Sequence, residues 1–391
     1  MSADTVEKDE SQPETGGSDR WRRIRAHRGD VLRGIRWGAS AAWILAVAYQ
    51  LYYDGVPFDR EGLLVWIAAG VTAFSIGRRN LLTVLVDWLP FAAVLIAYDY
   101  LRGLSDRLGM PTWWHPQVDV DKVLFLGREP TVWLQEKLNY PGVHWWDVLA
   151  SLCYSSFFLL PYVTAGVLWL RSRADFYRWS LRFVGLSFFC FTLFALIPAA
   201  PPWAAAVCTA KQVAGHPSNP PCMSNSAEFV PSGGILGHFT GVRAGANPWF
   251  ERLSGKGWSE LHLSTAESLL RKGQGAVDLV AAVPSLHLGG TMLFCIFMWR
   301  RVRKWLRPLL VAYPIAMTFS LVYTGEHYLS DCVAGALAAA LVSFVADRIE
   351  RRRERARAVD TLADEDQPAP SMESLCPPTT EPPTAMTPSS T

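Results

Sequence analysis

Long apolar segments with few charges dominate this sequence and restrict what it can fold into. A helix of about 20 mainly apolar residues crosses the hydrocarbon core of a bilayer. Eight segments approach that length, the second being short: 37–53, 62–77, 80–98, 148–170, 181–199, 281–299, 308–324 and 329–346. We therefore predict an all-α fold, a polytopic membrane helix bundle of about eight transmembrane helices.

The composition agrees with a chain that lies mostly in lipid. Of the 391 residues, 50% are hydrophobic and 18% are charged, whereas soluble domains carry about 25% charged residues. This excludes a disordered chain, a coiled coil and a small disulfide-stapled domain. The formal net charge of +2 gives no reason to expect a nucleic-acid partner.

Arginine clusters between the segments predict how the chain is oriented. With eight spans, five basic clusters fall on one side of the membrane: 21–36, 78–79, 171–182, 300–307 and 348–357. Because basic loops stay in the cytoplasm, we expect a multi-pass cell-membrane protein with both termini cytoplasmic. We expect four regions: a basic tail (1–36), two accessory transmembrane helices (37–79), the main bundle (80–347) and a disordered cytoplasmic tail (348–391).

Two long loops, 100–147 and 200–279, then lie on the outer side. Cys208 and Cys222 are in the second loop, and the sequence leaves open whether they pair. Pro130 to Leu138 mixes apolar and charged residues at helical spacing. It is either an interfacial helix on the outer leaflet or a helix packed within its loop.

Two short motifs carry groups suited to chemistry. The first is AVPSLH, ending at His287, at the outer start of the sixth span, and the second is YTGEHYLSD, at the outer turn into the eighth span. His327 and Asp331 are four residues apart, so they share one helix face. A carboxylate there can accept the Nδ1 proton of His327 and leave Nε2 free as a nucleophile. The predicted topology places both motifs on the same side of the membrane.

The PSLH and HxxxD motifs resemble the second and third motifs of the type 2 phosphatidic acid phosphatase superfamily. This resemblance covers roughly residues 80–347 and implies a six-helix catalytic bundle that needs no metal or cofactor. It implies that His327 attacks phosphorus to form a phosphohistidine, that Asp331 orients it, and that His287 protonates the leaving group and then activates the acceptor. Ser285 would hold a phosphoryl oxygen.

The sequence also departs from that family pattern. The first motif of the phosphatases, K-x6-R-P, does not occur; Leu321 replaces the arginine six residues before the nucleophile, and Leu286 replaces the commonest glycine. Phosphoryl transfer depends on cationic clamps, so a cation must come from elsewhere on the outer side. Arg102 is our candidate, with Arg107, Lys122 and Arg128 following it in the same loop. Arg102 has an equal alternative as a snorkelling interface residue.

The variant resembles the inositol phosphorylceramide synthase branch, which similarly has PSLH and HxxxD without the upstream arginine. The Pro201-Pro202-Trp203 turn also resembles that branch, although a rigid helix stop explains it equally well. We expect a lipid phosphatase or phosphotransferase acting at the extracytoplasmic face. Its partners would be a membrane lipid substrate and, for transfer, a polyol or sugar acceptor.

Two alternatives remain at the level of sequence. The two histidines together with Glu326 and Asp331 have the donor types of a transition-metal site. A non-catalytic family member, a transporter or a scaffold is the other alternative. Apart from Asp87, the spans are nearly free of charge, and an ion or proton relay would normally show more.

Overall fold

The computed structural model describes residues 16–53, 60–78, 80–101, 104–224, 233–258, 260 and 280–365. Arg102 therefore lies outside the described residues. The chain divides into two units, Met1–Ser343 and Phe344–Thr391. The described part of the second unit is helical to Glu365, and its arginines from Arg348 to Arg357 are exposed.

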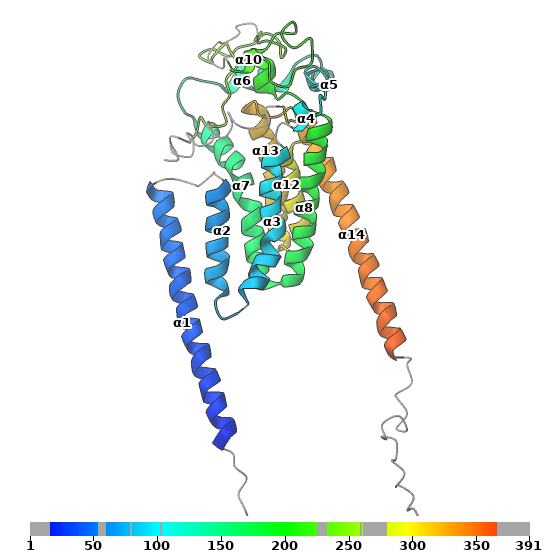
Figure 1. Ribbon diagram of the computed structural model, residues 1–391. Coiled ribbons are helices and arrows are strands. Elements are labelled where there is room, and N and C mark those ends of the chain that lie inside the picture. The colour runs from blue at the N-terminus through cyan, green and yellow to red at the C-terminus, as the bar shows by residue number, and fades with distance from the viewer. Residues whose placement is uncertain are drawn as a thin grey trace, which may run out of the picture. The chain divides into compact units, whose positions relative to one another are not determined.

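Eight helices account for the eight predicted spans. They are α1 (Gly16–Tyr53), α2 (Arg60–Ser75), α3 (Leu81–Leu101), α7 (Trp145–Arg171), α8 (Arg173–Leu196), α12 (Leu286–Met298), α13 (Arg307–Tyr323) and α14 (Leu329–Glu365). Five of the described helices are long and apolar enough to cross a membrane, and three apolar helices are shorter. No strand occurs within the described ranges, so the all-α membrane bundle is confirmed (Figure 1).

The predicted ends differ from the observed ones. Helix α1 begins at Gly16, within the expected N-terminal tail, and α14 continues as helix to Glu365. The expectation of a disordered tail from residue 348 is therefore wrong for the part up to Glu365. Apolar content, on which the span was predicted, stops at the membrane boundary, whereas charged residues with good helix propensity continue a helix beyond it.

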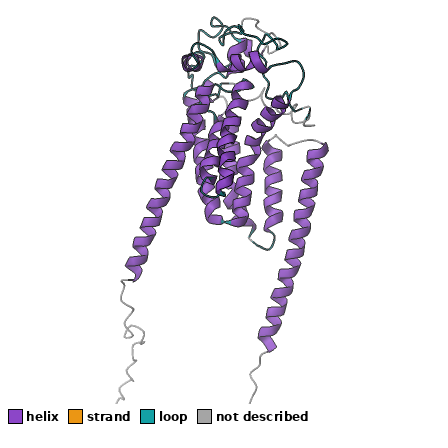
Figure 2. Cartoon of the chain, turned by 180° about the vertical axis from the view of Figure 1, so that it is seen from behind, coloured by secondary structure: helices purple, strands orange, loops and turns teal. Residues whose placement is uncertain are grey.

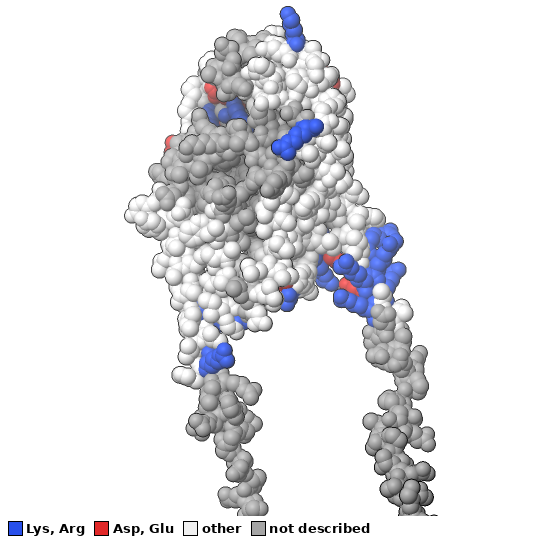
Figure 3. Space-filling model, in the orientation of Figure 1, with Lys and Arg blue, Asp and Glu red and all other residues white. Residues whose placement is uncertain are grey.

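The bundle in the first unit is built around aromatic side chains. Helix α7 packs on α8, α12 and α13, and α3 packs on α8. Phe91, Phe176, Trp179 and Phe183 form its buried centre. Asp87 is buried in α3, where it accepts hydrogen bonds from Trp169, Arg173 and Tyr177 at 2.6–3.0 Å. Figure 3 shows that charged side chains on the visible face of this unit lie mainly near the ends of the helices.

Short helices and loops cover one end of this bundle (Figures 1 and 2). They include α4 (Leu104–Arg107), α5 (Pro116–Leu124), α6 (Pro130–Leu138), α9 (Pro202–Val207) and α10 (Pro221–Ser224). Cys208 and Cys222 form a disulfide. The structure thus answers the question that spacing alone left open.

Of the two interpretations of α6, the structure supports the packed helix. Pro130, Thr131, Val132, Gln135 and Glu136 are buried. Glu136 accepts hydrogen bonds from the backbone nitrogens of Thr240 and Gly241. Contacts from the loop 200–279 therefore cover the face that an interfacial helix would bury in lipid.

Candidate active site

Two imidazoles from distant parts of the chain meet at the covered end of the bundle. His287 lies in the first turn of α12, and His327 lies in the turn between α13 and α14. His287 Nδ1 is 3.2 Å from His327 Nε2, and the ring planes are inclined at 60°. The structure therefore brings together the two histidines that the motifs single out.

Backbone contacts fix the segment that carries His287. The segment that follows α8 pairs with it, because Ala282 N donates to Ala199 O at 3.1 Å. Ser285 is the N-cap of α12, and its Oγ accepts from Leu288 N at 3.3 Å, as is usual for serine at this position. Ser285 N donates to Asp331 O at 3.0 Å. The two motifs are thus joined directly through their backbones.

The surroundings of His327 assign its tautomer. Its Nδ1 is 3.1 Å from the carbonyl oxygen of Ala282 and 3.6 Å from Asp331 Oδ2. Both neighbours are acceptors only, so Nδ1 carries the proton and Nε2 presents its lone pair toward His287. The sequence suggested Asp331 as the acceptor of this proton. In the structure the carbonyl is nearer, while the carboxylate adds its charge at slightly longer range.

Asp331 is fully buried, with 0% of its surface exposed. One carboxylate oxygen accepts from Tyr328 N at 2.9 Å, and the other, Oδ1, has no partner within the part of the chain that the structure describes. A buried carboxylate costs free energy unless it is paired. Its retention beside His327 is understandable if it stabilises positive charge on that ring.

His287 is enclosed by aromatic side chains of α7. Its ring stacks on Tyr154, with centroids 5.0 Å apart, and lies 4.3 Å from Phe157 and 5.9 Å from Phe158. Its Nε2 is buried and has no partner among the described residues. This cage fixes the ring plane and aims Nδ1 at His327.

Sequence reasoning missed Asp121, which positions the helix that carries Asp331. The two carboxylate oxygens of this α5 residue accept from Leu329 N at 2.7 Å and Ser330 N at 2.9 Å. These are backbone donors that the first turn of α14 leaves unpaired. Burial raises the pKa of Asp121, and the bonds from Ser330 and Leu329 partly offset that rise. The only local indication of such a contact was that Tyr328, which precedes α14, is a poor N-cap residue.

Arg252 was also missed. It donates from Nε and Nη2 to the two carboxylate oxygens of Glu326, each at 2.7 Å, and its guanidinium lies over the ring of Trp203 at 4.5 Å. Glu326 directly precedes His327. A bidentate ion pair therefore flanks the residue predicted to be the nucleophile.

The other cationic candidates from the sequence were Arg107, Lys122 and Arg128. Arg107 and Arg128 are exposed, and Lys122 is partly buried near the end of α5.

The metal alternative needs Glu326 as a ligand, but that carboxylate is bonded to Arg252. Among the described residues, no group of three or more His, Cys, Asp or Glu side chains is arranged to hold a metal ion.

The sequence model of the PAP2 superfamily matches residues 118–346, a range that contains both motifs, the whole loop 200–279 and part of the loop 100–147. The chain belongs to the PAP2 superfamily. Neither the curated proteins nor the solved structures include a significant match to it. Together with the apolar helices, this PAP2 membership supports a membrane enzyme of the phosphatase type.

Proposed function

We propose that this PAP2 protein transfers a phosphoryl-linked group from a membrane lipid through a phosphohistidine on His327. The observation that carries the proposal is the 3.2 Å approach of His287 Nδ1 to His327 Nε2, with the opposite nitrogen of His327 facing acceptors. A nucleophile and an acid–base partner within hydrogen-bond reach are what nucleophilic catalysis requires.

The two steps follow from these positions. The Nε2 lone pair of His327 attacks phosphorus, the bond from phosphorus to the leaving oxygen breaks, and His287 in its protonated form gives that oxygen a proton. His287, now neutral, takes the proton of a water or alcohol whose oxygen attacks the phosphohistidine. The phosphorus–nitrogen bond breaks, and both histidines return to their starting states. Asp331 and the Ala282 carbonyl stabilise the charge and orientation of His327 throughout.

The ring contact also indicates how substrate enters. In the structure the two nitrogens face each other directly. A phosphoryl group has to lie in line with Nε2 while its leaving oxygen reaches His287. We therefore propose that substrate binding separates the two rings.

The arginine distribution supports an extracytoplasmic site. Basic clusters favour the cytoplasmic side, and the histidine motifs belong to the opposite ends of their helices. The Cys208–Cys222 disulfide in the second outer loop is consistent with an oxidising compartment. We propose a cell-membrane enzyme with cytoplasmic termini and an outward-facing site.

Within the superfamily we propose an activity similar to that of inositol phosphorylceramide synthases, with transfer to a polyol or sugar hydroxyl. Leu321 in place of arginine supports this assignment. Trp203 of the Pro-Pro-Trp turn adds support, because it contacts Arg252 beside the site. Supplying candidate alcohols and looking for a new phosphodiester separates transfer from hydrolysis.

The test of the nucleophile is to trap the covalent intermediate. Purified protein is incubated with labelled phosphatidic acid or a labelled prenyl diphosphate and quenched, and acid-labile phosphate on the protein is measured. We expect an adduct on the wild-type protein and none on His327→Ala. His238→Ala serves as the matched control, because His238 is an exposed histidine of the second outer loop.

Two results would contradict the proposal. An adduct that survives in His327→Ala would refute the assigned nucleophile, and turnover unchanged in His287→Ala would favour a site elsewhere. We further expect activity to persist in EDTA. Loss of activity in EDTA with recovery on adding zinc would overturn the metal-free mechanism.

A further inference from the structure

The proposed chemistry leaves a charge to be neutralised. A phosphoryl group carries negative charge on its nonbridging oxygens, and these need fixed donors in the transition state. Position 321, where the family pattern has arginine, is a leucine that is 0% exposed. Helix α13 therefore supplies no cation at that place.

The Arg252 guanidinium occupies a position that can fill this role. It is held by Glu326, the residue next to His327, through two hydrogen bonds of 2.7 Å. Its guanidinium also lies over the ring of Trp203, at 4.5 Å from the ring centroid. Arg252 is thus held beside the segment that carries His327.

The backbone on either side of Arg252 is fixed. Gln135 of α6 donates to Glu251 O at 2.8 Å and accepts from Glu251 N at 3.0 Å. Leu253 N donates to Thr324 O at 3.1 Å, and Thr324 belongs to the turn that presents His327. The loop therefore places the guanidinium before any ligand binds, which is the condition for effective charge stabilisation.

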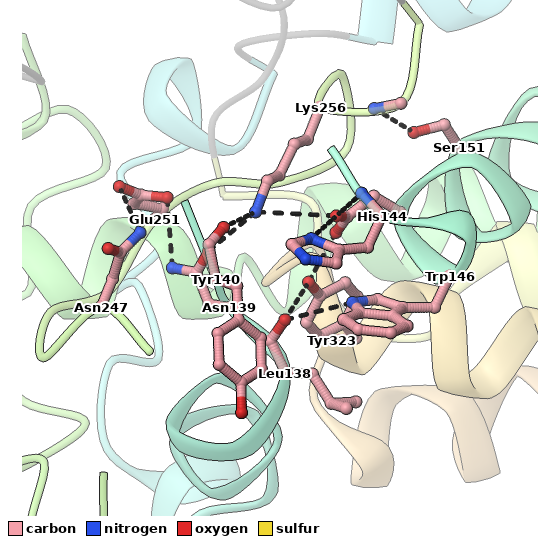
Figure 4. A network of polar contacts seen from close by, with 12 residues as sticks. Leu138, Asn139, Tyr140, His144, Trp146, Ser151, Asn247, Glu251, Lys256 and Tyr323 are labelled. Carbon is pink, nitrogen blue, oxygen red and sulfur yellow. Dashed lines mark hydrogen bonds and ion pairs between the residues drawn. The ribbon is translucent and has the colours of Figure 1, made fainter. Parts of the chain in front are cut away.

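Contacts of Lys256 also hold this loop in place, as Figure 4 shows. Lys256 Nζ donates to Tyr140 O at 2.7 Å and to Asn139 Oδ1 at 3.1 Å, and it lies 3.6 Å from the carboxylate of Asp147. Tyr323 OH donates to the same Asp147 side chain at 2.6 Å. This network joins both outer loops to α7 and α13, so the segment around Arg252 moves with the bundle.

The guanidinium retains unused donors. Within the part of the chain that the structure describes, its hydrogen bonds use Nε and Nη2, and its side chain is 29% exposed. Trp203 covers one face of the guanidinium. Burial favours the neutral form of Glu326, but Arg252 outweighs this and keeps the pKa of that carboxyl below its usual value. The pair therefore stays ionised, with Nη1 available to a ligand.

We propose that Arg252 binds a nonbridging oxygen of the phosphoryl group at His327 and is the phosphate-clamping cation of this enzyme. The inference rests on the proposed function for its reaction. Arginine suits the task because its planar fork can hold a carboxylate on one edge and a phosphoryl oxygen on the other. The cation then comes from the second outer loop and not from a transmembrane helix.

The test measures anion binding without turnover. Tungstate, a phosphate analogue, is titrated into detergent-purified wild-type, Arg252→Ala, Arg252→Lys and Arg243→Ala proteins, and the dissociation constants are compared. Arg243 is an exposed arginine of the same loop, so its variant is the matched control. We expect Arg252→Ala to weaken tungstate binding by about 10- to 100-fold, as expected for loss of a charge-assisted hydrogen bond. Arg243→Ala should bind as the wild type does.

A second measurement protects the test against misfolding. Added guanidinium ion should restore part of the phosphate release lost in Arg252→Ala, which an unfolded variant would not show. Wild-type tungstate affinity in Arg252→Ala, or no tungstate binding by the wild-type protein, would overturn the assignment of Arg252. Failure of the proposed function looks different, because no phosphohistidine would then form on the wild-type protein whatever residue 252 is.

Discussion

Replacing Gly335 with alanine tests whether the close contact between α12 and α14 sets the geometry of the site. Gly335 lies one helical turn after Asp331. A Cβ added at Gly335 would lie 3.1 Å from the carbonyl carbon of Ser285 and 3.2 Å from Gly289 N, with the Ser285 carbonyl oxygen nearer still. Since Ser285 N also donates to Asp331 O, the backbones that carry the two motifs meet at this point.

The magnitude follows from those distances. Carbon atoms in ordinary contact are about 3.5–4.0 Å apart, and neither neighbour is a flexible side chain, so the two backbones must separate. Overpacking of this kind costs about 1–3 kcal/mol of stability. A displacement of reacting groups by about 1 Å can lower the rate about 100-fold. We therefore expect Gly335→Ala to reduce kcat/KM far more than it reduces the unfolding temperature.

Two other glycines provide a graded control. A Cβ at Gly289 would lie 3.2 Å from Gly335 O, a milder conflict, and one at Gly185 would lie 3.6 Å from a methyl of Val342, an ordinary contact. Phosphate release and thermal unfolding in detergent should rank Gly335→Ala as most damaged, Gly289→Ala as intermediate and Gly185→Ala as wild-type or better. Wild-type kcat/KM in a folded Gly335→Ala protein would refute the reasoning, and Gly289→Ala carries the test if that variant does not fold.

Two further predictions concern buried acids of the loop 100–147. Burial raises the pKa of Glu129 from 4.5 to about 7, so between these values the native state holds a proton that the unfolded chain has lost. The unfolding free energy therefore falls by about 3 kcal/mol as pH rises through that range. The variant Glu129→Gln should lose this pH dependence. A wild-type unfolding free energy that stays constant from pH 5 to 8 would contradict the prediction. Asp121→Ala should lower the unfolding free energy by about 1 kcal/mol, because the N-cap of α14 is lost. It should also lower kcat, because α14 carries Asp331. A thermal midpoint and a kcat equal to those of the wild type would contradict the capping role of Asp121.

The apolar segments predicted most of the fold. A bilayer demands a run of apolar residues for each span, so the eight candidate segments can be located from local sequence, and a helix forms at each of them. The histidine motifs were equally visible, because His327 and Asp331 are linked by helical spacing. Length and hydropathy could not predict helix ends outside the membrane, such as the end of α14 at Glu365, because no change in apolar content occurs there.

The sequence by itself determined which residues can lie in the membrane and which two short motifs carry the side chains of the candidate site. Only the tertiary structure decided what surrounds those side chains. Arg252 reaches Glu326 across 74 residues and Asp121 reaches Leu329 across 208, and no local pattern encodes such pairs. The carbonyl of Ala282 that faces His327 is a backbone group present in every residue. Its role depends on where the fold places it and therefore cannot be predicted from the residue type.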